Sequence, residues 1–159
     1  FRKTLEHRKP GYSYNSGSWT GAFPANFWAR MAEGDSSQRV IDRHFMNALN
    51  PNFTCDFTGY WEIDGNLGIA AAVAEMLLQS HAGEIDLLPA LPTKYPDGEV
   101  HGLRARGGYE VDIRWKAGRL EEAVIKADRI TEPHTVQIRY KDRTVTADLN
   151  PDDRYTFTL

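Results

Sequence analysis

The chain has few of the features that mark metal, membrane or nucleic-acid proteins. Cys55 is its one cysteine, which excludes an internal disulfide and a metal cluster built on cysteines. The five histidines are scattered without the spacing of metal ligands. Its 19 basic and 22 acidic residues give a net charge of −3, without the basic footprint of a nucleic-acid-binding domain. No apolar run approaches a membrane span, and no signal-peptide pattern opens the sequence. We therefore expect no metal or organic cofactor, no nucleic-acid partner and no membrane contact.

What remains is the composition of a folded protein, with 41% hydrophobic and 26% charged residues. The hydrophobic period is helical up to about residue 82. A first helix is expected from Trp19 to Met31, with Pro24 in its first turn, where the missing N–H costs nothing. A second is expected to start at a cap, Asp35 or Ser36, and to end before residues 50–51. The short turn between them predicts an αα-hairpin.

A third helix is expected over residues 65–80, and it is apolar almost all round. Such a helix has to be buried in a body larger than three helices. The chain also opens on Phe1 and a charged segment, residues 2–9, which has the character of a helix entered midway. Both features indicate the C-terminal part of a longer protein.

The second half has the two-residue period of strands with one solvated face. Residues 116–119 predict a hairpin turn, and residues 87–92 predict a hinge because prolines resist both helix and central strand. Strands are expected at 109–115, 120–127, 134–140, 143–149 and 154–159. Roughly six short strands separated by turns predict a small antiparallel sandwich.

Residues 59–68, Gly-Tyr-Trp-Glu-Ile-Asp-Gly-Asn-Leu-Gly, carry the strongest chemical signal. Glu62 and Asp64 would share a face if the stretch is extended. Together with the amide of Asn66 and the ring of Trp61, they have what a pocket needs to hold a sugar and activate a water. Asp64 also stands where an N-cap is preferred, so the stretch is equally readable as a plain helix start. A capping carboxylate stays ionised in the helix dipole, as a general base must, so the two roles are compatible.

The other candidate residues have an ordinary structural interpretation beside the functional one. Trp19, Tyr60 and Trp61 are sugar-stacking platforms or ordinary core aromatics. Glu62 is a site acid or a solvated, Arg-paired one. Asn26, on an otherwise apolar helix face, is a better sign because a buried amide needs partners.

Five segments taken together resemble glycoside hydrolase family 95, the α-L-fucosidases that cleave terminal fucose from fucosyl-α-1,2-galactose. They are, in order along the chain, WTGAFPANFWAR (19–30), IDGN (63–66), AEMLLQSH (74–81), EIDLLPALP (84–92) and GLRARGG (102–108). The sequence departs from the family's pattern at Ser16, Gly21 and Pro24, where the family usually has His, Arg and Lys.

The resemblance implies an inverting hydrolase with an (α/α)6 barrel followed by a β domain. On that basis the chain is α+β in two parts, with residues 1–82 the last helices of the barrel and 83–159 a small antiparallel β-sandwich. It assigns the catalytic position of the Ile-Asp-Gly-Asn motif to Asp64, while the general acid of the family comes from earlier in the barrel. Substrate-contact roles are expected for the side chains of Asn66, Trp61, Trp19 and Glu62. The substrate is then an oligosaccharide, and the protein is expected to be secreted or extracellular.

Two other functions stay open from the residues alone. One is a non-catalytic carbohydrate-binding or structural module, in which Asp64 merely caps a helix. The other is a different (α/α)6 enzyme, such as a glycoside phosphorylase. The expected partners are the oligosaccharide and the N-terminal part of the same protein.

Overall fold

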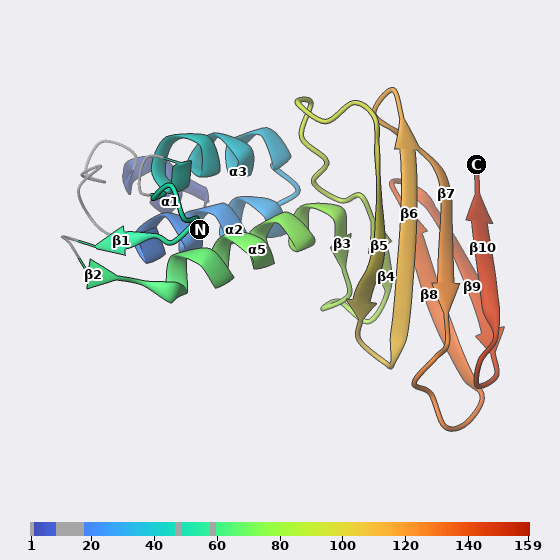
Figure 1. The fold of residues 1–159 in the computed structure, drawn as a ribbon. Helices are drawn as coiled ribbons and strands as arrows, with labels where there is room; N and C mark the ends of the chain where they lie inside the picture. Colours follow the sequence, from blue (N-terminus) through green and yellow to red (C-terminus); the bar gives the residue numbers. More distant parts are fainter. Residues whose placement is uncertain (1, 9–17, 47–48, 58–59) are drawn as a thin grey trace. The chain divides into compact units, whose positions relative to one another are not determined.

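A computed structural model describes residues 2–8, 18–46, 49–57 and 60–159 (Figure 1). The chain forms two compact units, Phe1–Val73 and Ala74–Leu159. Helices make up most of the first unit and strands most of the second, which confirms the α+β class. The sequence suggested a boundary after residue 82, whereas this division lies within the last helix. The end of that helix is hydrogen-bonded to the segment that follows the second strand of the C-terminal unit.

The helical part contains α1 (Arg2–Arg8), α2 (Ser18–Arg30), α3 (Gly34–Val40), the π-helical η1 (Ile41–Phe45) and α5 (Ile63–Leu77). Two short strands, β1 (Asp56–Phe57) and β2 (Tyr60–Trp61), pair as an antiparallel ribbon just before α5. None of the helices among the described residues has the length and apolar character needed to cross a membrane.

The expected hairpin of two helices is present as α2 and α3. Ala32 takes a positive φ of 58° in the turn, and the buried hydroxyl of Ser37 donates to the carbonyl oxygen of Ala25 at 2.8 Å. The prediction for Pro24 was wrong, because α2 already begins at Ser18 and Pro24 lies inside it. A proline there removes one helical hydrogen bond, so packing of the buried side of α2 outweighs the local preference.

The expected start and end of the second helix also need correction. Glu33 occupies the N-cap without a side-chain cap bond, and Asp35 lies in the first turn. Helical conformation continues beyond η1 to Met46, residues 47–48 lie outside the described residues, and Leu49 is not helical. Leu49 pairs instead with Cys55 in an isolated bridge, so the loop between them closes on itself.

Helix α5 begins and ends earlier than residues 65–80. The next two residues form β3 (Leu78–Gln79), in which Leu78 is buried in the β unit. The all-round apolar character of α5 leaves Leu67 63% and Val73 40% exposed. Its periodicity therefore identified a helix but not where the helix gives way to strand.

The C-terminal unit contains eight strands in two four-stranded sheets. One sheet has the order β10-β7-β6-β5 and the other β3-β4-β8-β9 (Figure 1). The remaining bounds are β4 (Ile85–Leu87), β5 (Gly98–Ala105), β6 (Tyr109–Lys116), β7 (Arg119–Lys126), β8 (His134–Tyr140), β9 (Arg143–Leu149) and β10 (Arg154–Thr158). The pairing is antiparallel with one exception, because β4 runs parallel to β8. The prediction of a purely antiparallel sandwich was wrong on this point.

Apolar side chains from both sheets form one core. Val111 and Ile125 come from one sheet, Ile85 and Ile138 from the other, and each is at most 1% exposed. The hairpin turn at residues 116–119 is confirmed, with Ala117 and Gly118 both at positive φ as a tight hairpin requires.

The hinge expected at residues 87–92 was wrong. Leu87 is in β4, and both Leu87 and Leu88 are buried in the core of the β unit. The N–H of Leu88 donates to the carbonyl oxygen of Leu77 at 2.8 Å, and that of Ala90 to Met76 at 3.1 Å. The prolines interrupt the strand, but burial of Leu87 and Leu88 just before them fixes the segment.

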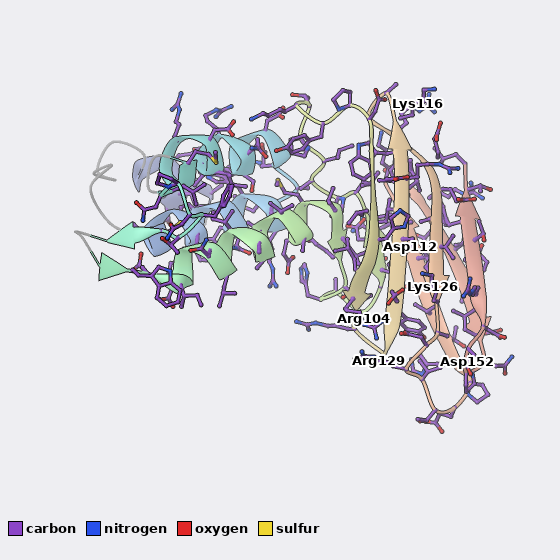
Figure 2. The ribbon with its side chains drawn as sticks, in the orientation of Figure 1. Arg104, Asp112, Lys116, Lys126, Arg129 and Asp152 are labelled. Atoms are coloured by element: carbon purple, nitrogen blue, oxygen red, sulfur yellow. The ribbon has the colours of Figure 1, made fainter. Side chains whose placement is uncertain are left out.

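The solvated face of the sheet β10-β7-β6-β5 carries alternating charges. Lys126 on β7 contacts Asp112 at 2.6 Å and Glu110 at 3.0 Å, both on β6 (Figure 2). Arg104 on β5 bonds Glu110 at 3.1 Å. Partial burial raises the pKa of Asp112, but hydrogen bonds from Lys126 and the Gly102 N–H outweigh it and the pKa is lowered. Because Arg104, Glu110 and Lys126 stand opposite one another in register, the charges support the strand pairing.

Candidate active site

A cavity of about 550 Å³ opens in the helical unit. Its described lining comes from α2, from the residue before α5 and from the first two turns of α5: Ala22, Phe23, Asn26, Glu62, Asp64 and Gly68. The walls thus combine two carboxylates and an amide with an aromatic ring. Its volume lies in the range of small-molecule sites.

Asp64 lies in the first turn of α5 and is exposed. It is not the N-cap, because the helix already begins at Ile63. Within the described part of the chain, its carboxylate takes part in no hydrogen bond or ion pair. The unpaired N–H groups of a helix N-terminus favour a negative charge nearby. Asp64 is therefore a carboxylate at the mouth of a cavity with no structural partner among these residues.

Glu62 lines the same cavity from the position before the helix. Its backbone N–H donates to the carbonyl oxygen of Cys55 at 2.8 Å, and its side chain is half-buried. The two acids do not reach the cavity by strand alternation as the sequence suggested, because Asp64 is already helical. They reach it because the chain turns into α5 between them.

Asn66 holds the loop before β1 against α5. Its Oδ1 accepts from the N–H of Cys55 at 3.1 Å, and its Nδ2 donates to the carbonyl oxygen of Phe53 at 2.8 Å. The described lining of the cavity does not include Asn66. Its amide is thus engaged in fixing the loop, and the structure gives it a positioning role beside the site.

Trp61 does not line the cavity with the two carboxylates. Trp61 is 63% exposed on β2, opposite Asp56, and is not among the described lining residues. The backbone of Trp19 lies in α2, but its side chain falls outside the described residues.

The aromatic wall of the cavity is Phe23 on α2. Phe23 is 53% exposed and stacks on Phe27 with centroids 6.3 Å apart. Asn26 lies one turn further along the same helix face. The spacing of Phe23 and Asn26 places them on one face of α2 and could have been recognised from the sequence. Only the position of α5 shows that this face meets the site.

Asn26 joins α2 to α5. Its Nδ2 donates to the carbonyl oxygens of Ala22 and Gly68, both at 2.8 Å. Two carbonyl acceptors consume both hydrogens of the amide and fix its orientation. No hydrogen bond among the described residues uses Oδ1, so the amide keeps an acceptor available to a ligand hydroxyl.

The described residues contain no group of three or more His, Cys, Asp or Glu side chains placed to hold a metal ion. The described lining of the cavity offers two carboxylates, an amide and an aromatic ring.

Comparison with known families decides how this arrangement is interpreted. The model of the glycosyl hydrolase family 95 catalytic domain matches residues 1–77, and that of the glycoside hydrolase family 95 C-terminal domain matches residues 79–158. This chain belongs to glycoside hydrolase family 95. The two matches meet close to the end of α5, where helix gives way to strand.

Curated relatives of this family 95 chain are named as fucosidases. Alpha-L-fucosidase 2 of Arabidopsis thaliana is 37% identical over 87% of the chain, and Probable alpha-fucosidase A of Aspergillus oryzae is 30% identical over 83%. A protein of the latter name from Aspergillus niger is 26% identical over 70%. The aligned region spans 17%, 20% and 16% of these relatives, so the chain corresponds to a small part of each.

Proposed function

We propose that this chain is the C-terminal part of an inverting glycoside hydrolase that removes terminal α-L-fucose, or a related L-sugar, from oligosaccharides. The observation that carries the proposal is the carboxylate of Asp64, which lies without a partner among the described residues at a helix N-terminus and lines a 550 Å³ cavity. Family membership and the names of the relatives supply the reaction class. In this proposal residues before 78 complete an (α/α)6 barrel whose other helices belong to the rest of the protein.

Asp64 acts as the base, or as the group that polarises the base. Its carboxylate accepts a proton from water, directly or through the base that it polarises, as the water attacks the anomeric carbon. The bond to the leaving sugar breaks on the opposite face, where an acid protonates the departing oxygen. An inverting pair needs roughly 6.5–9.5 Å between its carboxyl groups to admit the water. That acid comes from the part of the protein outside this chain.

The sugar is held by the other walls of the cavity. Phe23 presents an exposed ring on which the apolar face of a pyranose stacks. Asn26 accepts a sugar hydroxyl at Oδ1, because both of its amide hydrogens are already committed to carbonyl oxygens. Glu62 contributes a second carboxylate for hydrogen bonding to the substrate.

The test is Asp64→Asn in the whole protein, assayed on a fucosyl-α-1,2-galactoside. Turnover should fall by at least about 10³-fold with an unchanged melting temperature, because the carboxylate has no partner among the described residues whose loss would weaken the fold. Asp35→Asn is the matched control, since Asp35 also lies exposed in the first turn of a helix but lines no part of the cavity.

The alternatives predict different results. A non-catalytic module would show no turnover before substitution and at most the ~1 kcal/mol stability loss of a helix-terminus acid. A phosphorylase would release sugar only when phosphate is supplied. The 159-residue chain alone should release no fucose, and measurable release would contradict the assignment of the acid to another segment.

A further inference from the structure

A second cavity is lined by three segments of the β-sandwich; Figure 1 shows the strands that they connect. The three segments are the connection from β3 to β4, the turn from β5 to β6 and the start of β8. The lining residues that can hydrogen-bond through side chains are Ser80, Glu84, Arg106, Tyr109, His134 and Thr135. The cavity has a volume of about 160 Å³ and belongs entirely to the C-terminal unit.

Tyr109 is the unusual member of this lining. It is 2% exposed, and none of the described residues forms a hydrogen bond with its buried hydroxyl. Buried hydroxyl groups are nearly always paired, because the bond lost to water is costly to leave unmade. Burial also raises the pKa of Tyr109, so the hydroxyl keeps its proton and can both donate and accept. An unpaired group of this kind lining a cavity points to something that enters and binds it.

The neighbouring polar groups are held in place while keeping capacity for a ligand. The hydroxyl oxygen of Ser80 accepts from the N–H of Arg106 at 3.0 Å, which leaves its own hydrogen free to donate. Glu84 uses one carboxylate oxygen to accept from Nε of Arg139 at 2.6 Å. The hydroxyl of Thr135 donates to Asp148 at 2.6 Å and so presents lone pairs. Donors and acceptors therefore alternate around the cavity.

The turn from β5 to β6 keeps the cavity open. Gly107 has a φ of 90°, and a Cβ built on it would come within 2.9 Å of Cε2 of Tyr109. Any side chain at this position would push against the tyrosine ring. The glycine thus provides both the turn conformation and the room beside the ring.

We propose that this cavity of the sandwich binds a single neutral sugar residue, through hydroxyl groups that pair with Tyr109, Ser80 and Glu84. Mixed donors and acceptors suit a polyhydroxylated ligand, because each sugar hydroxyl both donates and accepts. Glu84 is ion-paired with Arg139, which also pairs with Asp86. The guanidinium of Arg106 in the lining offers further donors to sugar hydroxyls. A cavity of this size is below the ~300 Å³ at which drug-sized sites begin and suits one pyranose ring. The choice of sugar probes rests on the proposed function, but the site itself does not.

The test uses the whole protein carrying Asp64→Asn, so that no substrate is turned over, with 3-fluorotyrosine in place of tyrosine. The Tyr109 resonance is assigned by its absence from a Tyr109→Phe variant. L-fucose and D-galactose are titrated separately, with D-glucuronate as an anionic comparison. We expect one neutral sugar to shift the Tyr109 signal with a Kd on the order of 1–10 mM, and glucuronate to bind at least about tenfold more weakly.

The variants separate a ligand site from a structural role. Tyr109→Phe should keep or raise the melting temperature and weaken sugar binding, measured by calorimetry, about tenfold, since the lost hydroxyl had no protein partner. His134→Ala, at the exposed rim, should weaken binding by a smaller factor. Tyr95→Phe is the matched control, because Tyr95 is a tyrosine of the same unit that lines no part of this cavity.

Several outcomes would overturn the proposal. One is a Tyr109 signal that does not move at about 50 mM sugar; others are tighter binding of glucuronate than of any neutral sugar, and equal binding by Tyr109→Phe. A fall in melting temperature for Tyr109→Phe without any sugar binding would instead assign the hydroxyl to a buried water. Loss of fucosidase activity in the otherwise unmodified protein is not among these readouts, so failure here and failure of the proposed function are distinguishable.

Discussion

The Nδ2 atom of Asn26 donates to the carbonyl oxygen of Gly68 at 2.8 Å and so joins α2 to α5 along the wall of the carboxylate cavity. The helices can approach this closely because Gly68 has no side chain. A Cβ built at Gly68 would come within 2.5 Å of Cβ of Ala22. One small residue and one amide thus set the spacing between the aromatic wall and the acidic wall.

Replacing Gly68 with alanine should therefore destabilise the helical unit. Carbon atoms favour separations of about 3.5–4.0 Å, so the helices would have to move apart. We expect a loss of roughly 1–3 kcal/mol in the free energy of unfolding, measured by urea denaturation. Helix propensity alone predicts the opposite sign, a gain of about 1 kcal/mol, so the direction of the change decides. Adding Ala22→Gly should recover part of the loss by restoring the room.

Substitution of Asn66 by alanine should act on stability and loop order. The amide accepts from the N–H of buried Cys55 and donates to the carbonyl oxygen of Phe53, and the substitution removes both hydrogen bonds. The expected loss is about 1–3 kcal/mol in the free energy of unfolding, with little change in KM for enzyme that remains folded. A large rise in KM at unchanged stability would show that Asn66 contacts the sugar directly.

Phe23→Ala should affect substrate binding more than folding. The ring is over half exposed, so its loss removes little buried area. If it carries a sugar by stacking, KM should rise several-fold to about tenfold, as expected for a stacking contact worth ~1 kcal/mol. Trp61→Ala is the comparison, since Trp61 is more exposed and lines no part of the cavity. The opposite ranking of the two variants would move the aromatic platform to Trp61.

Stability of the β unit should depend on the ionisation of Asp86. Burial raises the pKa of this carboxyl to about 6 from 3.8, against the opposing attraction of Arg139 and with repulsion from Glu84. The side chain bonds Arg139 yet lies mostly out of water, so burial prevails. Because the folded state holds the proton more tightly, the stabilising contribution is complete below pH 3.8. It is lost as the pH rises through 6.

The measurement compares wild type with Asp86→Asn by urea unfolding between pH 4 and pH 7. Relative to pH 4, the wild type should lose up to about 3 kcal/mol more than the variant by pH 7. Asp142→Asn, in the exposed turn between β8 and β9, should follow the wild type. A constant difference between wild type and Asp86→Asn across this range would contradict the raised pKa.

Local signals in the sequence anticipated most elements but not their ends. The two-residue period of residues 109–115 and the turn at 116–119 predicted a hairpin, and the structure has it. Prolines at 89 and 92 suggested a hinge over residues 87–92, yet Leu87 and Leu88 of this segment are buried. A proline restricts the conformation that the backbone can adopt locally. Whether the segment is mobile depends on burial, which the one-dimensional pattern does not contain.

The sequence alone determined the family, the change from helix to strand and the importance of the segment from Trp61 to Asn66. Tertiary structure decided what each side chain there does. It places Asp64 at a cavity and occupies Asn66 with a loop, because backbone groups near α5 need those amide bonds. It also adds Phe23 and Asn26 to the site. Their position in the cavity wall depends on which face of α2 meets α5. That choice is made by a close approach at Gly68, between residues far apart in the chain, and no local pattern encodes it.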